Sequence, residues 1–433
     1  MKLRSLFLVA ALAAAFSAAF ADDWPTFRGP QRDGVSKETG LLKEWPKGGP
    51  KLVWTFDNAG LGHSSSAIVK GVLYTNGTRD GDEITLALDV ATGKEMWKAK
   101  IGPIFTFKSN IWGDGPRSVP TVDGDKLYVL GAQGDFLCLD TAGKELWRKN
   151  LIKDFEGEMM TEWGYSESPL VVGNLVIVTP GSQTQGTVVA FDKTSGKVVW
   201  QAKELKYKAP YTSAVYAEIH GVPQVIQAGY SADPEGGYLS GISLKDGKLL
   251  WSEQMVKGHN YSIASTPLVK GNQVYVSAGT GAGCHLFDID KDFKVKDLYG
   301  VKAKKSVKNN HGGLVLIGDH IYGHSEGSVW VCQEFKTGKL AWEERDDFKT
   351  KSGATTGADG MLYLLSEGGD VALVEANPAA WKLVSQFELP KRSKYPKQMP
   401  SAKFSSPWAH PVISDGKLFL RDHEYIFCFD VKK

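Results

Sequence analysis

The 433-residue sequence predicts an all-β fold, an eight-bladed β-propeller of four-stranded blades. A motif of Asp, Gly-Lys and Trp recurs, and Trp97, Trp147, Trp200 and Trp251 follow one another at intervals of 50, 53 and 51 residues. A second pattern, two short apolar runs joined by a Gly or Asp turn, occurs eight times. Regular repeats of this length are typical of propellers, in which each repeat forms one sheet of a closed ring.

The repeat contains the signals of short strands joined by hairpins. Residues 118–128 and 265–275 show the pattern clearly, with apolar runs bounded by Gly, Asn and Asp. The Gly of the Gly-Lys pair supplies the positive φ of a tight turn, and the Trp after it can fill the gap between neighbouring sheets. Further copies begin near Ser65, Ser168, Ser213, Gly312, Thr355 and Ser406. The repeats at residues 288–299 and 374–384 are degenerate.

The two ends of the repeat region complete one another. Residues 51–54 form an outer strand with no Asp-Gly-Lys before it, and residues 417–420 and 425–429 form inner strands with no Trp after them. We therefore expect a propeller over residues 51–433, closed by N- and C-terminal strands that share one blade. Residues 22–50 are expected to form an N-terminal strap, or leader, that packs Trp24 and Phe27 against the ring.

Residues 1–21 have the composition of a cleaved signal peptide. Lys2 and Arg4 precede an apolar stretch, and Ala19-Phe20-Ala21 has the small-x-small pattern of a cleavage site. The alternative is a membrane anchor, because the 17 residues from Ser5 to Ala21 approach spanning length. No Cys lies near the cleavage site, so there is no lipobox. The sequence predicts a periplasmic or secreted protein with no stable membrane insertion after cleavage.

The charge balance argues against a nucleic-acid-binding protein, and the positions of the cysteines argue against disulfides. Removing Lys2 and Arg4 with the signal peptide leaves 49 basic and 49 acidic side chains, which excludes nucleic acid as the main partner. The four cysteines occupy similar places in different repeats and should point the same way around the ring. They are expected to be free core thiols, and they are Cys138, Cys284, Cys332 and Cys428.

Candidate site residues lie in the polar loops before the innermost strands. These loops converge on the axis at one face of a propeller and predict a polar axial funnel. The candidates are His63, Arg117, Glu162, Trp163, Tyr165, Tyr211, Asn260, Tyr261, Asn310, His311 and Lys351. Each has a structural alternative: Arg117 as an ion pair between blades instead of an anion clamp, and Trp163 and Tyr165 as packing instead of a stacking surface.

The repeated motif also carries a family resemblance. Residues 87–97 and 190–200 match Ala-x-Asp-x-x-Thr-Gly-x-x-x-Trp closely, and the chain resembles the pyrroloquinoline-quinone-like (PQQ-like) β-propeller repeat family, as a secreted single-domain member. The resemblance implies that catalytic members hold PQQ with Ca²⁺ on the axis, often beside a disulfide between adjacent cysteines. This sequence has no adjacent Cys pair and no CxxCH haem motif. It therefore assigns no cofactor, and PQQ with Ca²⁺ enters only through the resemblance.

The sequence favours a non-catalytic binding or scaffold protein whose funnel holds an exported protein, a peptide or a carbohydrate. Non-enzymatic members of the family that it resembles hold other proteins through their loops. The alternative is a PQQ-dependent dehydrogenase of alcohols or sugars. A third hypothesis places hydrolytic or metal chemistry at His63, His259 and His311. The sequence leaves open whether the protein is an enzyme.

Overall fold

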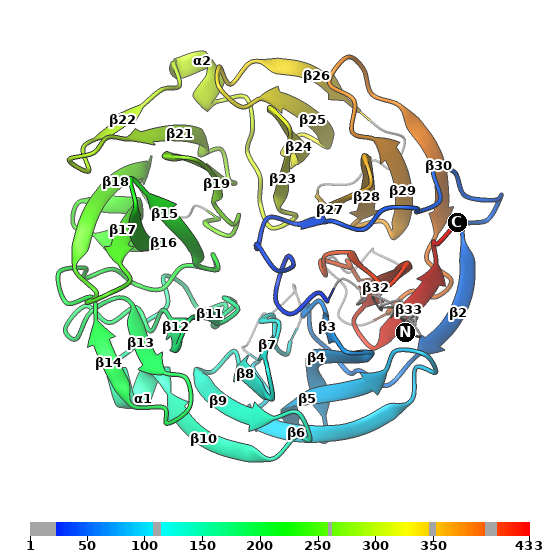
Figure 1. Ribbon diagram of the computed structural model, residues 1–433, viewed down its shortest axis with the longest axis horizontal. Helices are drawn as coiled ribbons and strands as arrows, with labels where there is room; N and C mark the ends of the chain where they lie inside the picture. The colour runs from blue at the N-terminus through cyan, green and yellow to red at the C-terminus, as the bar shows by residue number, and fades with distance from the viewer. Residues whose placement is uncertain (1–22, 107–113, 259–261, 346–351, 395–404) are drawn as a thin grey trace, which may run out of the picture.

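The computed structural model describes residues 23–106, 114–258, 262–345, 352–394 and 405–433. Eight sheets stand around a common axis (Figure 1), so the predicted eight-bladed propeller is confirmed. The predicted signal peptide, residues 1–21, lies outside the described residues. No helix in the described ranges is long and apolar enough to cross a membrane.

The blades are numbered here in chain order, and their strands run from the axis outward. Blade 1 contains β3 (Ala67–Val69), β4 (Val72–Arg79), β5 (Asp82–Asp89) and β6 (Glu95–Pro103). Blade 2 contains β7 (Thr121–Asp123), β8 (Lys126–Leu130), β9 (Asp135–Asp140) and β10 (Glu145–Asn150). Blade 3 contains β11 (Leu170–Val172), β12 (Leu175–Val178), β13 (Val189–Asp192) and β14 (Val198–Gln201). Blade 4 contains β15 (Val215–Ile219), β16 (Val222–Ala232), β17 (Glu235–Ser243) and β18 (Leu249–Lys257).

The second half of the ring repeats this arrangement. Blade 5 contains β19 (Leu268–Lys270), β20 (Gln273–Ala278), β21 (Gly283–Ile289) and β22 (Val295–Asp297). Blade 6 contains β23 (Leu314–Ile317), β24 (His320–Ser325), β25 (Val329–Glu334) and β26 (Leu340–Glu344). Blade 7 contains β27 (Gly353–Ala358), β28 (Met361–Ser366), β29 (Asp370–Glu375) and β30 (Leu383–Glu388). Two short helices, α1 (Leu151–Phe155) and α2 (Val301–Lys304), lie in connections between blades.

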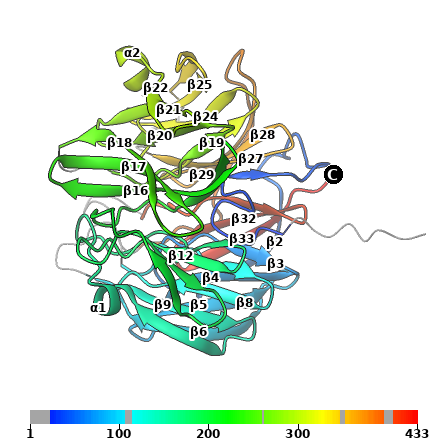
Figure 2. The same cartoon turned by 60° about the vertical axis from the view of Figure 1, so that its left-hand side comes forward.

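Blade 8 closes the ring as the sequence predicted. It contains β31 (Val412–Ser414), β32 (Lys417–Asp422) and β33 (Tyr425–Asp430) from the C-terminus and β2 (Lys51–Phe56) as its outer strand. β2 pairs antiparallel with β33, and the two strands lie side by side in Figure 2. Both ends of the propeller are therefore held by one set of ladder hydrogen bonds.

The Trp and Gly of the repeated motif connect neighbouring blades. Trp97 of blade 1 donates its Nε1–H to the carbonyl of Thr141 in blade 2, over 3.0 Å. Gly143, with φ +87°, lies against the same ring, and a Cβ there would be 2.7 Å from Trp97 Cε3. Gly196 and Trp147 repeat this contact between blades 2 and 3. The motif therefore requires Gly both for its positive φ and for the space that the Trp ring occupies.

The N-terminal segment, residues 23–50, is called the strap here, and it crosses the centre of the ring (Figure 1). Trp24 is buried and bridges to Ile68 of blade 1. Further along, β1 (Val35–Ser36) pairs in parallel with β27 and adds a fifth strand to blade 7. Between these two points the strap passes the axis, where it forms one boundary of the central cavity.

All four cysteines are buried and unpaired, as the repeat positions predicted. Each lies in a blade core on a different strand, for example Cys138 on β9 and Cys428 on β33. Burial raises the pKa of each thiol. The cysteines therefore serve as small apolar core residues.

Candidate functional site: an axial cavity closed by the strap

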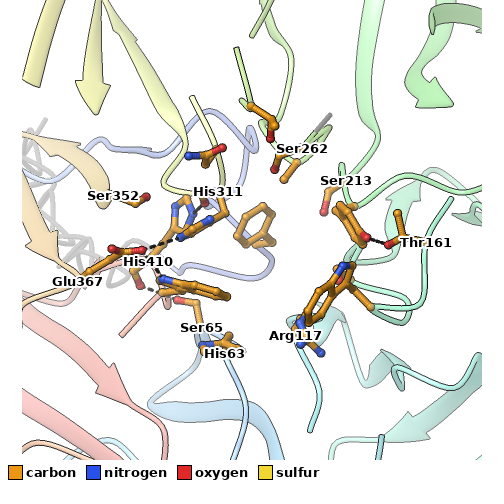
Figure 3. A pocket seen from close by; sticks show the side chains of 18 of the residues that line it. His63, Ser65, Arg117, Thr161, Ser213, Ser262, His311, Ser352, Glu367 and His410 are labelled. Atoms are coloured by element: carbon orange, nitrogen blue, oxygen red, sulfur yellow. Dashed lines mark hydrogen bonds and ion pairs between the residues drawn. The ribbon is translucent and has the colours of Figure 1, made fainter. Parts of the chain in front are cut away.

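A cavity of about 540 Å³ lies on the axis (Figure 3), and every blade and the strap contribute to its lining. A volume of this order is in the range of small-molecule sites. We call it the axial cavity.

Six of the predicted site residues line the axial cavity, and they are His63, Arg117, Trp163, Tyr211, Asn310 and His311. Two others lie elsewhere. Glu162 is exposed, and Tyr165 is buried in a blade core, where its hydroxyl donates to the Pro180 carbonyl over 2.8 Å. Asn260, Tyr261 and Lys351 lie outside the described residues, as does His259.

Arg117, in the loop before β7, supplies a positive charge to the cavity wall. Its guanidinium carbon lies 5.3 Å above the Phe105 ring centroid, and its Nη1 donates to the Gly115 carbonyl over 3.2 Å. Beside it, the Glu83 carboxylate accepts hydrogen bonds from the backbone N–H groups of Phe105 and Ala132. Burial raises the pKa of Glu83 to about 7, and the charge of Arg117 partly offsets this rise. The Arg117 guanidinium of blade 2 therefore interacts electrostatically with Glu83 of blade 1, and it also faces the cavity.

Trp408 forms the opposite aromatic wall together with two histidines. The His63 ring stacks on Trp408 with centroids 4.6 Å apart, and the His311 ring lies 4.2 Å from it at a tilt of 47°. The indole N–H donates to Glu367 Oε1 over 2.8 Å. These contacts fix the indole plane, so this wall is preorganised.

Both cavity histidines beside the strap are neutral at neutral pH. Burial lowers the pKa of His311 to about 3, and burial next to the Arg28 charge lowers that of His410 to about 3. His311 Nε2 lies 3.7 Å from Glu367 Oε1, too far for a hydrogen bond. At neutral pH the uncharged His311 ring therefore makes no ion pair with Glu367.

The strap forms the base of the cavity. The Phe27 ring lies edge-on to His410 with centroids 5.1 Å apart, and it lines the cavity. Behind it, the buried Arg28 donates to the carbonyls of Asp33, over 2.8 Å, and Leu314. Arg32 donates to carbonyls at the starts of the inner strands of blades 3 and 4. The strap is thus fastened around the axis by two buried guanidinium groups.

The sequence did not identify several lining residues. Glu326 lies between β24 and β25, and Glu367 lies between β28 and β29, so both occupy loops joining the second and third strands of a blade. These loops open on the same face as the loops that precede the inner strands. The candidates predicted from the sequence all lie in the loops that precede the inner strands. A polar residue at that turn is the signal that could have identified them.

The described lining residues do not fit PQQ with Ca²⁺ well. No group of three or more His, Cys, Asp or Glu side chains among them could hold a metal ion. PQQ carries three carboxylates, whereas the described lining offers Arg117 as its one permanently cationic side chain and two carboxylates, Glu326 and Glu367. Ca²⁺ takes six to eight oxygen ligands, and this donor set does not supply them.

Comparison with known proteins identifies the family. A family model described as outer membrane protein assembly factor BamB matches residues 80–344. The assembly factor BamB of Alkalilimnicola ehrlichii is 25% identical over 214 residues, 48% of this chain and 50% of that protein. The quinohemoprotein alcohol dehydrogenase ADH IIB of Pseudomonas putida is 27% identical over 135 residues, 30% of this chain and 18% of that protein. The matches span about half the length of the assembly factor and less of the dehydrogenase.

Solved structures share the fold at low sequence identity. BamB from Moraxella catarrhalis superposes with a TM-score of 0.59 at 14% identity, covering 88% of this chain and 99% of that one. Quinohemoprotein alcohol dehydrogenase from Comamonas testosteroni gives a TM-score of 0.63 at 12% identity, covering 95% of this chain and 81% of that one. From the family model and the eight-bladed ring together, we conclude that the chain belongs to the PQQ-like β-propeller family.

Proposed function

We propose that the protein is an exported, non-catalytic binding protein that holds another polypeptide at the cavity face of its ring. The observation that carries this proposal is the lining of the axial cavity. Fixed aromatic rings and serine hydroxyls such as Ser65, Ser213 and Ser262 surround it, while the imidazoles of His311 and His410 are neutral. Such a surface favours hydrogen bonding and stacking over proton transfer at neutral pH.

The proposed location is the periplasm or the outside of the cell. The Ala19-Phe20-Ala21 pattern and the apolar segment before it support export and cleavage after Ala21. Two of the relatives are named as outer membrane assembly factors, which agrees with a role at the cell envelope. A mature N-terminus at Asp22, measured by mass spectrometry of the exported protein, is the expected result.

Site-specific photo-crosslinking in cells tests the binding function. A benzoylphenylalanine at Ser262, on the cavity wall, should give discrete adducts with a polypeptide, whereas one at Met96 should not. Met96 is 55% exposed on β6 at the outer edge of the ring and serves as the matched control. Equal labelling from both positions, or none from Ser262 and other cavity positions, would contradict the proposal.

The second candidate is a PQQ-dependent dehydrogenase of alcohols or sugars. The similarity to the Pseudomonas putida enzyme and the position of Arg117 on an aromatic-lined cavity favour testing it. Titration of the purified mature protein with PQQ and Ca²⁺, followed by tryptophan fluorescence, is the measurement. One-to-one saturable quenching that is lost in Arg117→Ala, with dye-linked turnover of an alcohol or sugar, would replace the binding proposal with this one.

A further inference from the structure

The charged side chains on the wall of the axial cavity already interact with other groups of the protein. Arg117 donates to the Gly115 carbonyl over 3.2 Å, and its guanidinium lies over the Phe105 ring. Burial lowers the pKa of Arg117, and the nearby carboxylates of Glu83 and Asp114 partly offset this decrease. The guanidinium charge is therefore balanced by carboxylates of the protein itself.

The two carboxylates of the described lining are also hydrogen-bonded within the protein. Glu326 accepts the backbone N–H groups of Thr280 and Gly281, the latter over 2.9 Å. Glu367 accepts the indole N–H of Trp408 over 2.8 Å. An ammonium or carboxylate group of a ligand needs a charged partner that is free to pair with it when it is buried. The cavity therefore favours an uncharged ligand.

Uncharged hydrogen-bonding groups remain available on one side of the cavity. Ser65 and Ser213 are already bonded, the first to the His410 carbonyl over 2.7 Å and the second to the Ser168 N–H over 2.9 Å. Other hydroxyl and amide side chains of the lining make no hydrogen bond within the described part of the chain, and they are Ser262, Thr280, Asn310 and Ser352. They come from blades 5, 6 and 7, which are neighbours in the ring, and Figure 3 shows Ser262 and Ser352 on the side away from Arg117. These groups both donate and accept, so they suit the N–H and C=O groups of a peptide backbone.

Aromatic rings supply the apolar part of the cavity. Tyr211 and Trp408 are fixed by hydrogen bonds of their hydroxyl and indole N–H groups. Phe27 of the strap closes the base, and Trp163 lies in the wall. Such rings pack favourably against another aromatic ring in edge-to-face or offset geometry. Because the walls are fixed, they lose little conformational freedom when a ligand binds.

An aromatic side chain with its flanking amides fits this lining better than a carbohydrate does. A carbohydrate that filled the cavity would carry hydroxyl groups on all sides, and those against the rings would be buried without partners, which is costly. The volume of about 540 Å³ gives room for an aromatic side chain and the amides beside it. Because the strap crosses the axis, a chain that carries this side chain enters and leaves at the same face, as a loop does.

We propose that the axial cavity receives one aromatic side chain from a loop of the bound polypeptide. The ring lies among Phe27, Trp163 and Tyr211, and the amides on either side of it bond the available hydroxyl and amide groups of blades 5, 6 and 7. This inference rests on the proposed binding function and assigns the part of the partner that enters the cavity.

The test uses the mature protein and the peptide Gly-Gly-Phe-Gly-Gly, acetylated at its N-terminus and amidated at its C-terminus. Two analogues carry Leu or Ala in place of Phe. Titration calorimetry measures the affinities, and the fluorine NMR signal of a para-fluorophenylalanine form reports saturation. We expect saturable binding of the Phe peptide and binding of the Ala peptide that is weaker by about tenfold or more, because the buried ring surface is lost. The Leu peptide should lie between them, and removal of the caps should not raise the affinity.

Variants of the protein locate the binding site. Ala264→Phe and Ser262→Phe place a ring of the protein itself in the cavity, so each should weaken binding of the Phe peptide by about tenfold or more. The matched control, Ala380→Phe, adds the same side chain at an exposed position between β29 and β30 and should leave the affinity unchanged. Asn310→Ala removes an available amide and should weaken the Phe and Leu peptides by the same factor of about three, because both share one backbone. Circular dichroism and thermal unfolding establish that each variant is folded.

Three outcomes overturn the inference. They are no saturable binding of the Phe peptide, equal affinity for the Phe and Ala peptides, and undiminished binding in the folded cavity-filling variants. Binding of maltotriose without binding of the Phe peptide would identify a carbohydrate site instead. If any of these occurs while a crosslinker at Ser262 still labels a polypeptide, the binding function stands and only the assignment of the aromatic side chain is wrong.

Discussion

At Gly143, two separate constraints act on one backbone position. Its φ of +87° disfavours any residue with a Cβ, and that Cβ would lie 2.7 Å from the ring of Trp97. We expect Gly143→Ala to lower the free energy of unfolding by about 2–4 kcal/mol, because backbone strain and overpacking add. Urea denaturation measures the loss.

The matched control is Gly124→Ala in the same blade. Gly124 has φ +62°, and a Cβ there would meet no atom within 4 Å, so this variant carries only the backbone strain, about 1–2 kcal/mol. Equal losses in the two variants would show that the Trp97 ring moves freely and that the motif Gly is required for its φ alone.

His410 should make the protein sensitive to acid. Its Nε2 lies 3.0 Å from the His311 carbonyl and its Nδ1 lies 3.5 Å from Arg28, so the neutral ring donates through Nε2 and has no room for a second proton. Its pKa is lowered to about 3, so the unfolded chain binds more protons below pH 6.5, and stability falls as pH drops from 6.5 to about 3. His410→Gln should reduce this slope by about 1 kcal/mol per pH unit.

The comparison of variant with wild type is essential because the titration of other buried groups changes the stability in the opposite direction. Burial raises the pKa of Glu83 and of Glu167 to about 7, so their contribution to stability falls as pH rises from about 4.5 to 7. The contributions of these groups cancel in the difference between the unfolding free energies of His410→Gln and wild type. This difference should be constant between pH 7 and 8 and should change only in acid. A difference that is flat down to pH 4 would contradict a neutral buried His410.

Among the elements, the strap connects several blades through its hydrogen bonds. Arg32 donates to the Ala214 carbonyl over 2.8 Å and to the Ser168 carbonyl over 2.6 Å. Arg32→Met retains the length of the side chain but leaves these buried acceptors unsatisfied, which should cost about 2–4 kcal/mol. Urea denaturation measures the cost, and limited proteolysis should cut the strap faster in the variant. The control is Arg345→Met at an exposed position, which should change stability by less than about 0.5 kcal/mol. A similarly small effect of Arg32→Met would mean that the strap is not held by its arginines.

At the scale of the whole molecule, the ring was predicted from the interval between Trp residues, the number of blades from the eight copies of the paired apolar runs, and the closure from the complementary ends of the repeat region. This succeeded because each blade repeats one local pattern, and the contact of Gly143 with Trp97 forms between two consecutive repeats of the chain. The cavity was predicted less completely. His63, Arg117 and His311 lie in the loops that repeat position identifies, and Trp408 lies in a loop of the same kind, before β31, but was not among the candidates. Glu367 reaches the axis from a different loop, between β28 and β29. The arginines of the strap were not predicted, because their partners are backbone carbonyls, which have no sequence signal.

Ring closure should limit the stability of the whole propeller. Lys51 pairs with Asp430 between β2 and β33, so Lys51→Cys with Asp430→Cys places a disulfide across the seam. The bond would close nearly the whole chain into a loop and should raise the free energy of unfolding by about 2–5 kcal/mol. Denaturation with and without reductant, with Lys51→Cys alone as control, measures this. An unchanged transition in the oxidised form would mean that the ring opens elsewhere first.

The same seam sets an order of events during synthesis. β2 emerges about 380 residues before its partner β33. Until then β2 is an unpaired strand edge with the apolar side chains of Leu52 and Val53 on it, and such edges associate with other chains. A chain that crosses a membrane N-terminus first would keep this edge exposed until β33 follows. Productive assembly would then depend on whether β33 pairs with β2 before another molecule binds to the same edge.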